Sequence, residues 1–212
     1  ETALGFALAA SGAPLTVPPA IAPLPRQMLL LLLVQQHDPA LSADGAWQRA
    51  GALAALLDDM QRYQLPPDAL RRIVPAELAQ HWQQTLDFLQ IITRVWPELL
   101  AGQGLLDPVA YHDRLVAEQI VLWQRAPPAY PVIAAGSTAS QPATARLLQA
   151  ILALPHGKVI LPGLDQHLPE TIWETLGDEP AHPQHTMQQW LQHCGVPRRA
   201  VARWPCGTDA AP

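Results

Sequence analysis

The segment Val132–Asp165, VIAAGSTASQPATARLLQAILALPHGKVILPGLD, constrains the fold more than any other part of the chain. A short apolar run, Val132–Ala135, stops at Gly136. A helix is predicted to begin at Pro142, because the first helical turn is where the missing N–H of proline is needed least. A second apolar run, Lys158–Leu161, ends at Pro-Gly. The spacing leaves room for a parallel crossover, so the segment predicts a strand–helix–strand unit.

The loop after the first predicted strand, Gly136-Ser137-Thr138-Ala139-Ser140, is polar but contains no carboxylate. An ATP-hydrolysing domain usually holds magnesium with an acidic residue at this place. The sequence also contains no G-x-x-x-x-G-K-[ST] motif and no G-x-S-x-G motif. The pattern therefore predicts a nucleotide-handling skeleton that does not hydrolyse. The loop could hold an anion through its N–H groups, and the alternative is a simple turn and helix cap.

The rest of the chain suggests three parts and an α/β fold with a large all-helical insertion. Residues 1–25 are rich in Ala and Pro and are predicted to form an extended connector. Residues 26–126 carry apolar side chains at helical spacing and are predicted to form a helical subdomain. After the Pro-rich stretch 126–131, residues 131–206 are predicted to form the α/β part. Because the chain starts at Glu1 and ends in a polar tail, we expect it to be a piece of a longer polypeptide.

Helix signals recur through the chain, with two helices and a third strand expected after the crossover. We expect a helix from Pro25 to about Gln36, a second from Ser42-Ala43-Asp44 with Trp47, Ala50, Leu53, Leu57 and Met60 inward, and a short one led by Pro66-Pro67. The longest helix is expected over Ala76–Leu100, stopped by Gly102 and Gly104, and the next starts at Asp107-Pro108 with Val109, Val116, Ile120 and Trp123 inward. After the crossover, helices are expected over Pro169–Leu176 and Gln184–Cys194, and a strand over Val201–Trp204.

Charge and composition limit the possible partners. The formal net charge is −5, so no global basic field attracts nucleic acid. DNA contact would have to be local, through Arg71-Arg72 or through Arg198-Arg199 with Arg203, and the alternative is that these are solvated helix ends. Only 15% of residues are charged, which suits a module that rests against other domains.

Compartment and membrane signals are few. The two cysteines, Cys194 and Cys206, form no disulfide framework and fit a reducing compartment. The most apolar run, Met28–Val34, is far shorter than the roughly 20 residues that span a bilayer. It is predicted to be a buried helix segment. We therefore expect a soluble, cytoplasmic protein without membrane contact.

The sequence offers no catalytic or metal site. His182, His185, His193 and Cys194 are suitable zinc ligands, but their spacing fits no familiar zinc pattern, so helix capping is the better interpretation. The acidic residues of the helical part are scattered over different helices, and nothing pairs them as acid and base. The tryptophans could stack on bases, but core packing is favoured because four of them fall on apolar helix faces. These four are Trp47, Trp82, Trp96 and Trp123.

Three phrases together resemble the AddB family, in its alphaproteobacterial form. They are AGSTASQPATARLLQAILALPHGKVILPGLD, the upstream PAELAQHWQQTLDFLQIITRVWPELL and the downstream HPQH. The resemblance extends from about Pro18 to Trp204. It implies a subunit that pairs with AddA in an ATP-dependent helicase–nuclease, which resects DNA double-strand breaks for recombinational repair.

The resemblance further implies that the chain is part of a degenerate superfamily-1 helicase-like core of the P-loop type. AddA carries the motor. Magnesium and, in many members, an iron–sulfur cluster belong to the nuclease domain at the C-terminus of the AddB family, so no cofactor is expected in this part. In an active motor, Ile133–Gly136 would end in acidic residues; this sequence has Ala-Gly-Ser there, so hydrolysis by this module is not expected.

The expected function is therefore that of a non-hydrolysing module that guides DNA ends and docks AddA. The alternative is a pure protein-interaction scaffold without direct DNA contact, which the low surface charge favours. A mononucleotide-binding role would need a phosphate loop upstream of Glu1. The candidate DNA-binding residues are Ser137, Thr138, Ser140, Arg198 and Arg199.

Overall fold

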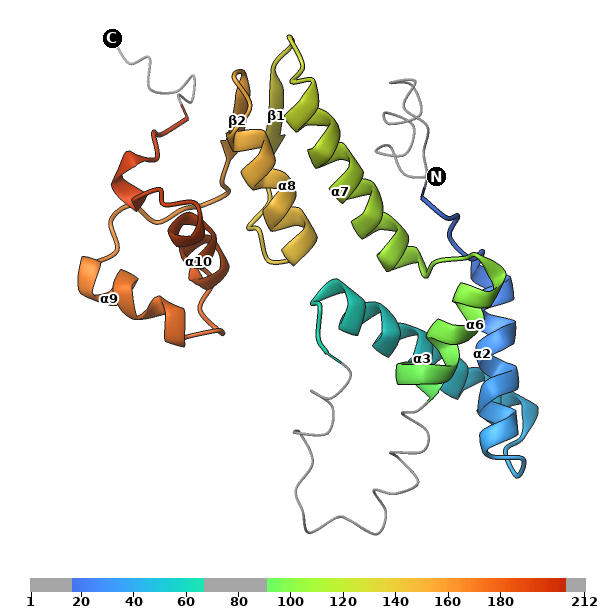
Figure 1. Cartoon of the computed structure of the whole chain (residues 1–212). Helices are drawn as coiled ribbons and strands as arrows, with labels where there is room; N and C mark the ends of the chain where they lie inside the picture. The colour runs from blue at the N-terminus through green and yellow to red at the C-terminus, as the bar shows by residue number, and fades with distance from the viewer. Residues whose placement is uncertain (1–16, 67–90, 205–212) are drawn as a thin grey trace, which may run out of the picture. The chain divides into compact units, whose positions relative to one another are not determined.

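The computed structural model describes residues 17–66 and 91–204 (Figure 1). The chain divides into two compact units, Glu1–Glu118 and Gln119–Pro212. The division falls inside helix α7, Pro108–Arg125, rather than at the Pro-rich stretch 126–131 that the sequence favours as a boundary. None of the helices in the described ranges is long and apolar enough to cross a membrane.

The described part of the first unit is mainly helical. It contains α2 (Pro23–His37), α3 (Ala43–Arg62), a π-helical turn η2 (Ile91–Val95), α6 (Trp96–Gln103) and the beginning of α7. Helices α2 and α3 pack against each other.

The described end of the expected connector is an ordered part of this unit. Ile21 N donates to Leu106 O over 2.9 Å, and Leu106 N donates to Pro19 O over 3.0 Å. The Ile21 side chain is only 3% exposed, so this segment packs into the core of the unit.

Local signals place several helix ends. Ser42 caps α3, because its Oγ accepts from Gly45 N over 3.1 Å, as expected. Helix α2 begins two residues earlier than predicted, at Pro23. Gly104 ends α6 with a left-handed φ of 65°, whereas Gly102 lies within that helix and does not stop it. The helix led by Pro66-Pro67, most of the helix over Ala76–Leu100, and Arg71-Arg72 lie outside the described residues.

In the first unit, the burial of two groups of apolar side chains differs from the expectation. Met28–Val34 was expected to be buried, yet only Leu30 and Val34 are, while Met28 and Leu32 are 44% and 49% exposed. Trp47 was expected to face inward and is 44% exposed. In both cases other residues of the same helix fill the available core surface. The buried set is Ile21, Leu30, Val34, Ala46, Ala50, Leu53, Leu57, Met60, Ile91, Trp96 and Leu100.

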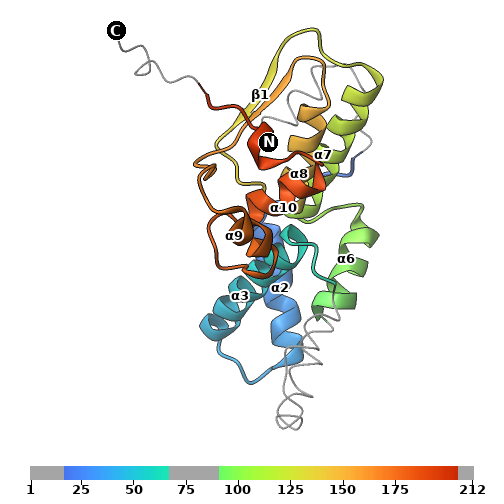
Figure 2. The same ribbon diagram turned by 90° about the vertical axis from the view of Figure 1, so that its left-hand side faces the viewer.

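The second unit contains the expected strand–helix–strand segment. Strands β1 (Val132–Ala135) and β2 (Gly157–Ile160) are parallel and are joined through α8 (Pro142–Leu152). Helix α8 contacts both strands and lies beside β1 in both views (Figures 1 and 2). The local prediction is confirmed, with β2 beginning one residue before the predicted start.

The remainder of this unit is built from short helices. They are α9 (Glu170–Thr175), η3 (Leu176–Asp178), α10 (His185–His193) and η4 (Arg198–Ala200). The two helices expected after the crossover are confirmed, but the third strand expected over Val201–Trp204 is wrong. In the described part of the chain the sheet contains β1 and β2 alone, and the segment after the turn η4 makes no strand pairing.

The hydrophobic core of the second unit lies between α8, η3 and α10. Trp190 joins two of these helices, because its Nε1 donates to Ala145 O of α8 over 3.0 Å. The buried residues of this core are Ala139, Leu148, Trp173, Leu176, Trp190 and Leu191. In α7 Val116 is buried as expected, while Val109, Ile120 and Trp123 are half-buried and Leu115 lies deepest.

Candidate functional site

The loop that follows β1 turns sharply and folds back on itself. Gly136 adopts a φ of 83°, and its N–H donates to Ile160 O over 3.2 Å. Ser137 Oγ accepts from Ala139 N over 3.2 Å, which closes a small turn. Ala139 has a φ of 59°, uncommon for a residue with a Cβ, and its methyl group is buried in the core. The core therefore holds the loop in one conformation.

The candidate hydroxyls of this loop have different environments. Ser137 and Thr138 are half-buried, whereas Ser140 is exposed. The hydroxyl of Ser137 is engaged in the turn, so Thr138 and Ser140 are the side chains that remain available to an approaching ligand. These two contribute short neutral donors, which can contact phosphate but add no charge.

Helix α8 begins directly after the loop. Its N-cap is Gln141, whose side chain makes no capping hydrogen bond in the described structure, and Pro142 follows at the first helical position. The first N–H groups of a helix have no intrahelical acceptor, and the helix dipole favours a negative charge there. The loop and the start of α8 together form a group of neutral N–H and O–H hydrogen-bond donors.

The candidate Arg198 does not belong to this site. Its side chain is 7% exposed, and its Nη2 forms a 2.7 Å ion pair with Glu170 Oε2. Its Nη1 donates to Asp165 O over 3.2 Å, and its guanidinium lies 4.7 Å from the centre of the Trp173 ring. Through these contacts the guanidinium links the segment after α10 to α9. Arg198 therefore contributes to packing within the second unit, and its contact with DNA stays a prediction.

The nearby arginines differ from Arg198 in their exposure to solvent. Arg199 and Arg203 are both exposed. Both therefore remain candidates for DNA contact.

The histidine segment lies at the start of helix α10, but no side-chain capping hydrogen bond is made at the N-cap, Gln184. His182 Nδ1 accepts from Gln184 N over 3.1 Å, just before α10 begins. His185 Nδ1 lies 2.6 Å from Leu176 O and donates to it, which ties α10 to η3. Among residues 17–66 and 91–204, no cluster of three or more His, Cys, Asp or Glu side chains is placed to hold a metal ion.

A buried polar cluster in the first unit was not anticipated from the sequence. Asp107 is 2% exposed, and its Oδ1 accepts from Arg26 Nε over 2.8 Å. Its Oδ2 accepts from Trp96 Nε1 over 2.7 Å and from Gln61 Nε2 over 2.8 Å. Arg26 also pairs with Asp58 Oδ1 at 2.7 Å. Two acids that the sequence places on different helices thus share one arginine.

The nearest signal in the sequence is Arg26 itself, one basic residue at the start of a strongly apolar helix. Its partners lie 32 and 81 residues further along the chain, so no local pattern reveals the cluster. The arrangement balances buried charge and satisfies donors; it contains no pair of groups poised to exchange a proton with a substrate.

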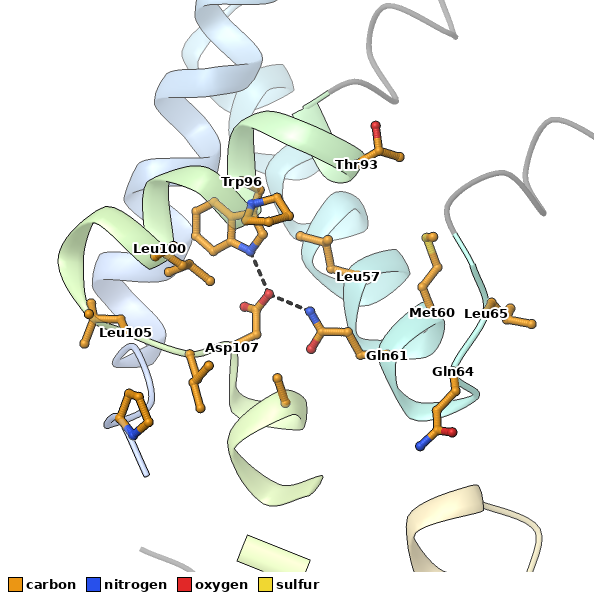
Figure 3. Close-up of a pocket in the computed structure, with 16 residues that line it drawn as sticks. Leu57, Met60, Gln61, Gln64, Leu65, Thr93, Trp96, Leu100, Leu105 and Asp107 are labelled. Atoms are coloured by element: carbon orange, nitrogen blue, oxygen red, sulfur yellow. Dashed lines mark hydrogen bonds between the residues drawn. The ribbon is translucent and has the colours of Figure 1, made fainter. Parts of the chain in front are cut away.

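A pocket of about 600 Å³ opens beside this cluster (Figure 3). Trp96, Leu57, Met60 and Leu100 make most of its surface apolar, and Asp107 and Gln61 approach each other at its polar side. Both carboxylate oxygens of Asp107 are already occupied by protein donors. The pocket therefore has the shape of a binding site, but the one carboxylate among its described lining residues is engaged within the protein.

No family model, curated protein or solved structure matches the chain.

Proposed function

We propose that the chain is a non-hydrolysing, helicase-like module of an AddB-type subunit, which docks AddA and helps to guide DNA ends in a helicase–nuclease that resects double-strand breaks. One observation carries this proposal: the parallel β1–α8–β2 crossover has an uncharged Gly-Ser-Thr loop where a hydrolysing domain has acids. A skeleton of this kind can position a nucleic-acid backbone without turning over ATP.

The loop after β1 supports the DNA-guiding part of the proposal. Thr138 and Ser140 offer hydroxyls next to the donor-rich start of α8, and neutral donors of this kind commonly position phosphate groups. Exposed Arg199 and Arg203 are candidate cations from the same unit.

An exposed apolar stripe supports the docking part. On α2, Leu24, Met28 and Leu32 are 64%, 44% and 49% exposed and recur every four residues, so they lie on one face. Trp47 of α3 shares a shallow hollow with Leu24. Contiguous apolar side chains on a surface commonly mark a protein–protein interface. The apolar stripe of Leu24, Met28, Leu32 and Trp47 is thus our candidate face for AddA.

The DNA part is tested with the AddA complex and a forked duplex with a 3′ tail, by fluorescence anisotropy over a range of salt. Thr138→Ala with Ser140→Ala should weaken binding several-fold, while the matched change Thr171→Ala with Thr175→Ala on α9 should not. Arg199→Ala should lower the slope of log affinity against log salt by about one, because one phosphate contact is lost. Unchanged affinity and slope in all variants would remove DNA guidance from the proposal.

The docking part is tested by co-purification with the AddA subunit of the same organism. Met28→Glu with Leu32→Glu places charges on the apolar stripe and should reduce AddA binding by about tenfold or more, since burial of each side chain contributes about 1.5–3 kcal/mol. Ala117→Glu, at an exposed position of α7 outside the apolar stripe, is the control and should bind normally. If AddA never co-purifies with the wild-type chain, the AddB assignment itself fails.

A pure interaction scaffold is the second candidate, and one finding favours it. Arg198 is held inside the second unit, where its guanidinium is already engaged by Glu170 and Trp173. The two functions differ in the anisotropy experiment, because a scaffold would show AddA binding without any DNA affinity of its own. Wild-type AddA binding combined with loop and arginine variants that leave DNA binding intact would favour the scaffold.

A further inference from the structure

A groove of about 660 Å³ runs along strand β2 in the second unit. All four residues of β2, Gly157–Ile160, line it, and the segment Ala200–Trp204 lines it as well. Trp190, Leu191 and Val196 supply further apolar lining. The groove therefore lies between an edge strand and a segment that follows the strand in sequence without pairing with it in the described structure.

The backbone of β2 offers hydrogen-bonding groups to this groove. Val132 N donates to His156 O and Gly136 N donates to Ile160 O, so alternate residues of β2 face β1. Val159 lies between the residues that face β1, and its N–H and C=O therefore point to the opposite edge. An edge with open backbone groups is a template for another strand.

The far wall of the groove is held in place by the protein itself. Gln166 Nε2 donates to Val201 O, and buried Arg198 anchors the turn that precedes the segment. No described strand pairs with this edge of β2, and the residues of β2 line the groove. The arrangement is a slot beside a strand, closed on the other side by a fixed segment.

The charged side chains at the groove indicate which kind of peptide it can bind. Lys158 and Arg203 are the charged side chains among the residues that line the groove, and both are exposed. Exposed Trp204 adds an aromatic surface next to Arg203. A basic rim over an apolar interior favours a strand that alternates acidic and apolar side chains, because successive side chains of a strand point to opposite faces.

We propose that this groove binds an extended acidic peptide segment of a partner protein, which adds to β2 as a third strand. Main-chain hydrogen bonds to the edge around Val159 provide affinity, and the pairing of acidic side chains with Lys158 and Arg203 provides selectivity. The proposal depends on the geometry of β2 and its groove and does not rest on the relationship to AddB.

The direct test uses the whole chain and short fluorescein-labelled peptides. A peptide of alternating Glu and Val should bind with saturable anisotropy and lose affinity as salt is raised, because the rim charges are exposed. Its counterpart with Lys in place of Glu, and a Glu-Val peptide with a central Pro that cannot pair, should both bind at least about tenfold more weakly. Equal binding of the acidic and basic peptides would overturn the proposal.

Two variants locate the peptide. Lys158→Glu with Arg203→Glu should reverse the preference, so that the Lys-Val peptide becomes the tighter ligand. The matched change Arg114→Glu with Arg125→Glu, at exposed positions that do not line the groove, should leave the preference unchanged. Val159→Pro removes the groove-facing donor without removing a bond to β1, and it should weaken acidic peptide binding.

The charge reversal keeps the test decisive even if Val159→Pro disturbs folding. A charge-reversed protein that still prefers the acidic peptide would overturn the proposal, whatever the effect of the proline. A second copy of the chain in the groove would also overturn it, and would appear as a concentration-dependent dimer that acidic peptide does not dissociate.

Discussion

Removal of the Asp107 carboxylate should destabilise the first unit more than any other single loss of charge in its described part. The carboxylate accepts hydrogen bonds from Arg26, Trp96 and Gln61 at 2.7–2.8 Å, and it is 2% exposed. Asp107→Ala would leave the indole N–H of Trp96 without its acceptor in the core. It would also leave Arg26, itself 7% exposed, with Asp58 as its one remaining carboxylate.

The magnitude follows from what each group loses. A buried donor without a partner costs about 1–3 kcal/mol, and removal of one member of a buried ion pair costs about 3–5 kcal/mol. Asp58 continues to neutralise part of the charge of Arg26, so these costs are not additive. We expect Asp107→Ala to lower the free energy of unfolding by about 3–5 kcal/mol. Asp107→Asn, which keeps one carbonyl acceptor, should cost less.

The assay is urea denaturation followed by far-ultraviolet circular dichroism and by tryptophan fluorescence. Asp59→Ala is the matched control on α3. Asp59 pairs with Arg62 at 2.6 Å, but its side chain is 61% exposed, so its loss should cost at most about 1 kcal/mol. A double-mutant cycle with Arg26→Met should return a coupling energy between Arg26 and Asp107 of more than about 1 kcal/mol.

An Asp107→Ala variant as stable as Asp59→Ala would refute the reasoning. That result would mean that the three donors find other acceptors, or water, at no cost. A large loss in Asp107→Ala with no coupling to Arg26 would instead assign the energy to Trp96 and Gln61.

Further predictions concern local structure and titration. Gly157→Ala should cost more than about 3 kcal/mol, because a Cβ there would lie 1.7 Å from Ile151 O, whereas Gly177→Ala meets nothing within 4 Å; equal unfolding midpoints would contradict this. Ser42→Ala should cost about 1 kcal/mol in the same assay through loss of the N-cap of α3, and a neutral result would show that the cap is dispensable. Burial raises the pKa of the Cys194 thiol, so the folded state keeps this proton longer than the unfolded chain. Stability should therefore fall, relative to Cys194→Ser, as pH rises above the ordinary thiol pKa of about 8.5; parallel pH profiles would be inconsistent with it.

Arg198 and Arg199 show why local charge patterns are weak guides to which side chains are exposed. Two adjacent arginines look alike in sequence, yet one is buried against Glu170 and Trp173 and the other is exposed. The difference comes from the turn η4, which points the first side chain into the unit. A substitution series that treats Arg198-Arg199 as one basic patch would therefore mix a folding defect with a binding defect.

The two proposed interaction surfaces can be tested independently. The apolar stripe on α2 lies in the first unit, and the groove along β2 lies in the second. Met28→Glu with Leu32→Glu should leave the affinity for the acidic peptide unchanged. Lys158→Glu with Arg203→Glu should leave the binding of AddA unchanged. Loss of both functions in either variant would indicate global unfolding.

Features that depend on neighbouring residues were predictable from the sequence alone. The apolar runs, Gly136 and Pro142 determine the strand–helix–strand segment, because strand ends and helix starts are set by residues within a few positions. The same holds for the N-cap at Ser42 and for the α10 start at the histidine segment. The interpretation of the chain as AddB-like also comes from the sequence and remains a proposal.

Features that depend on distant residues were decided only by the tertiary structure. Arg26 and Asp107 are 81 residues apart, and their contact exists because α2, α3 and α6 pack around the start of α7. Packing also decides that Met28, Leu32 and Trp47 remain exposed and that Val201–Trp204 stays apart from β2. The periodicity of a helix or strand states which residues share a face, but which face is covered depends on the elements that the rest of the chain brings against it.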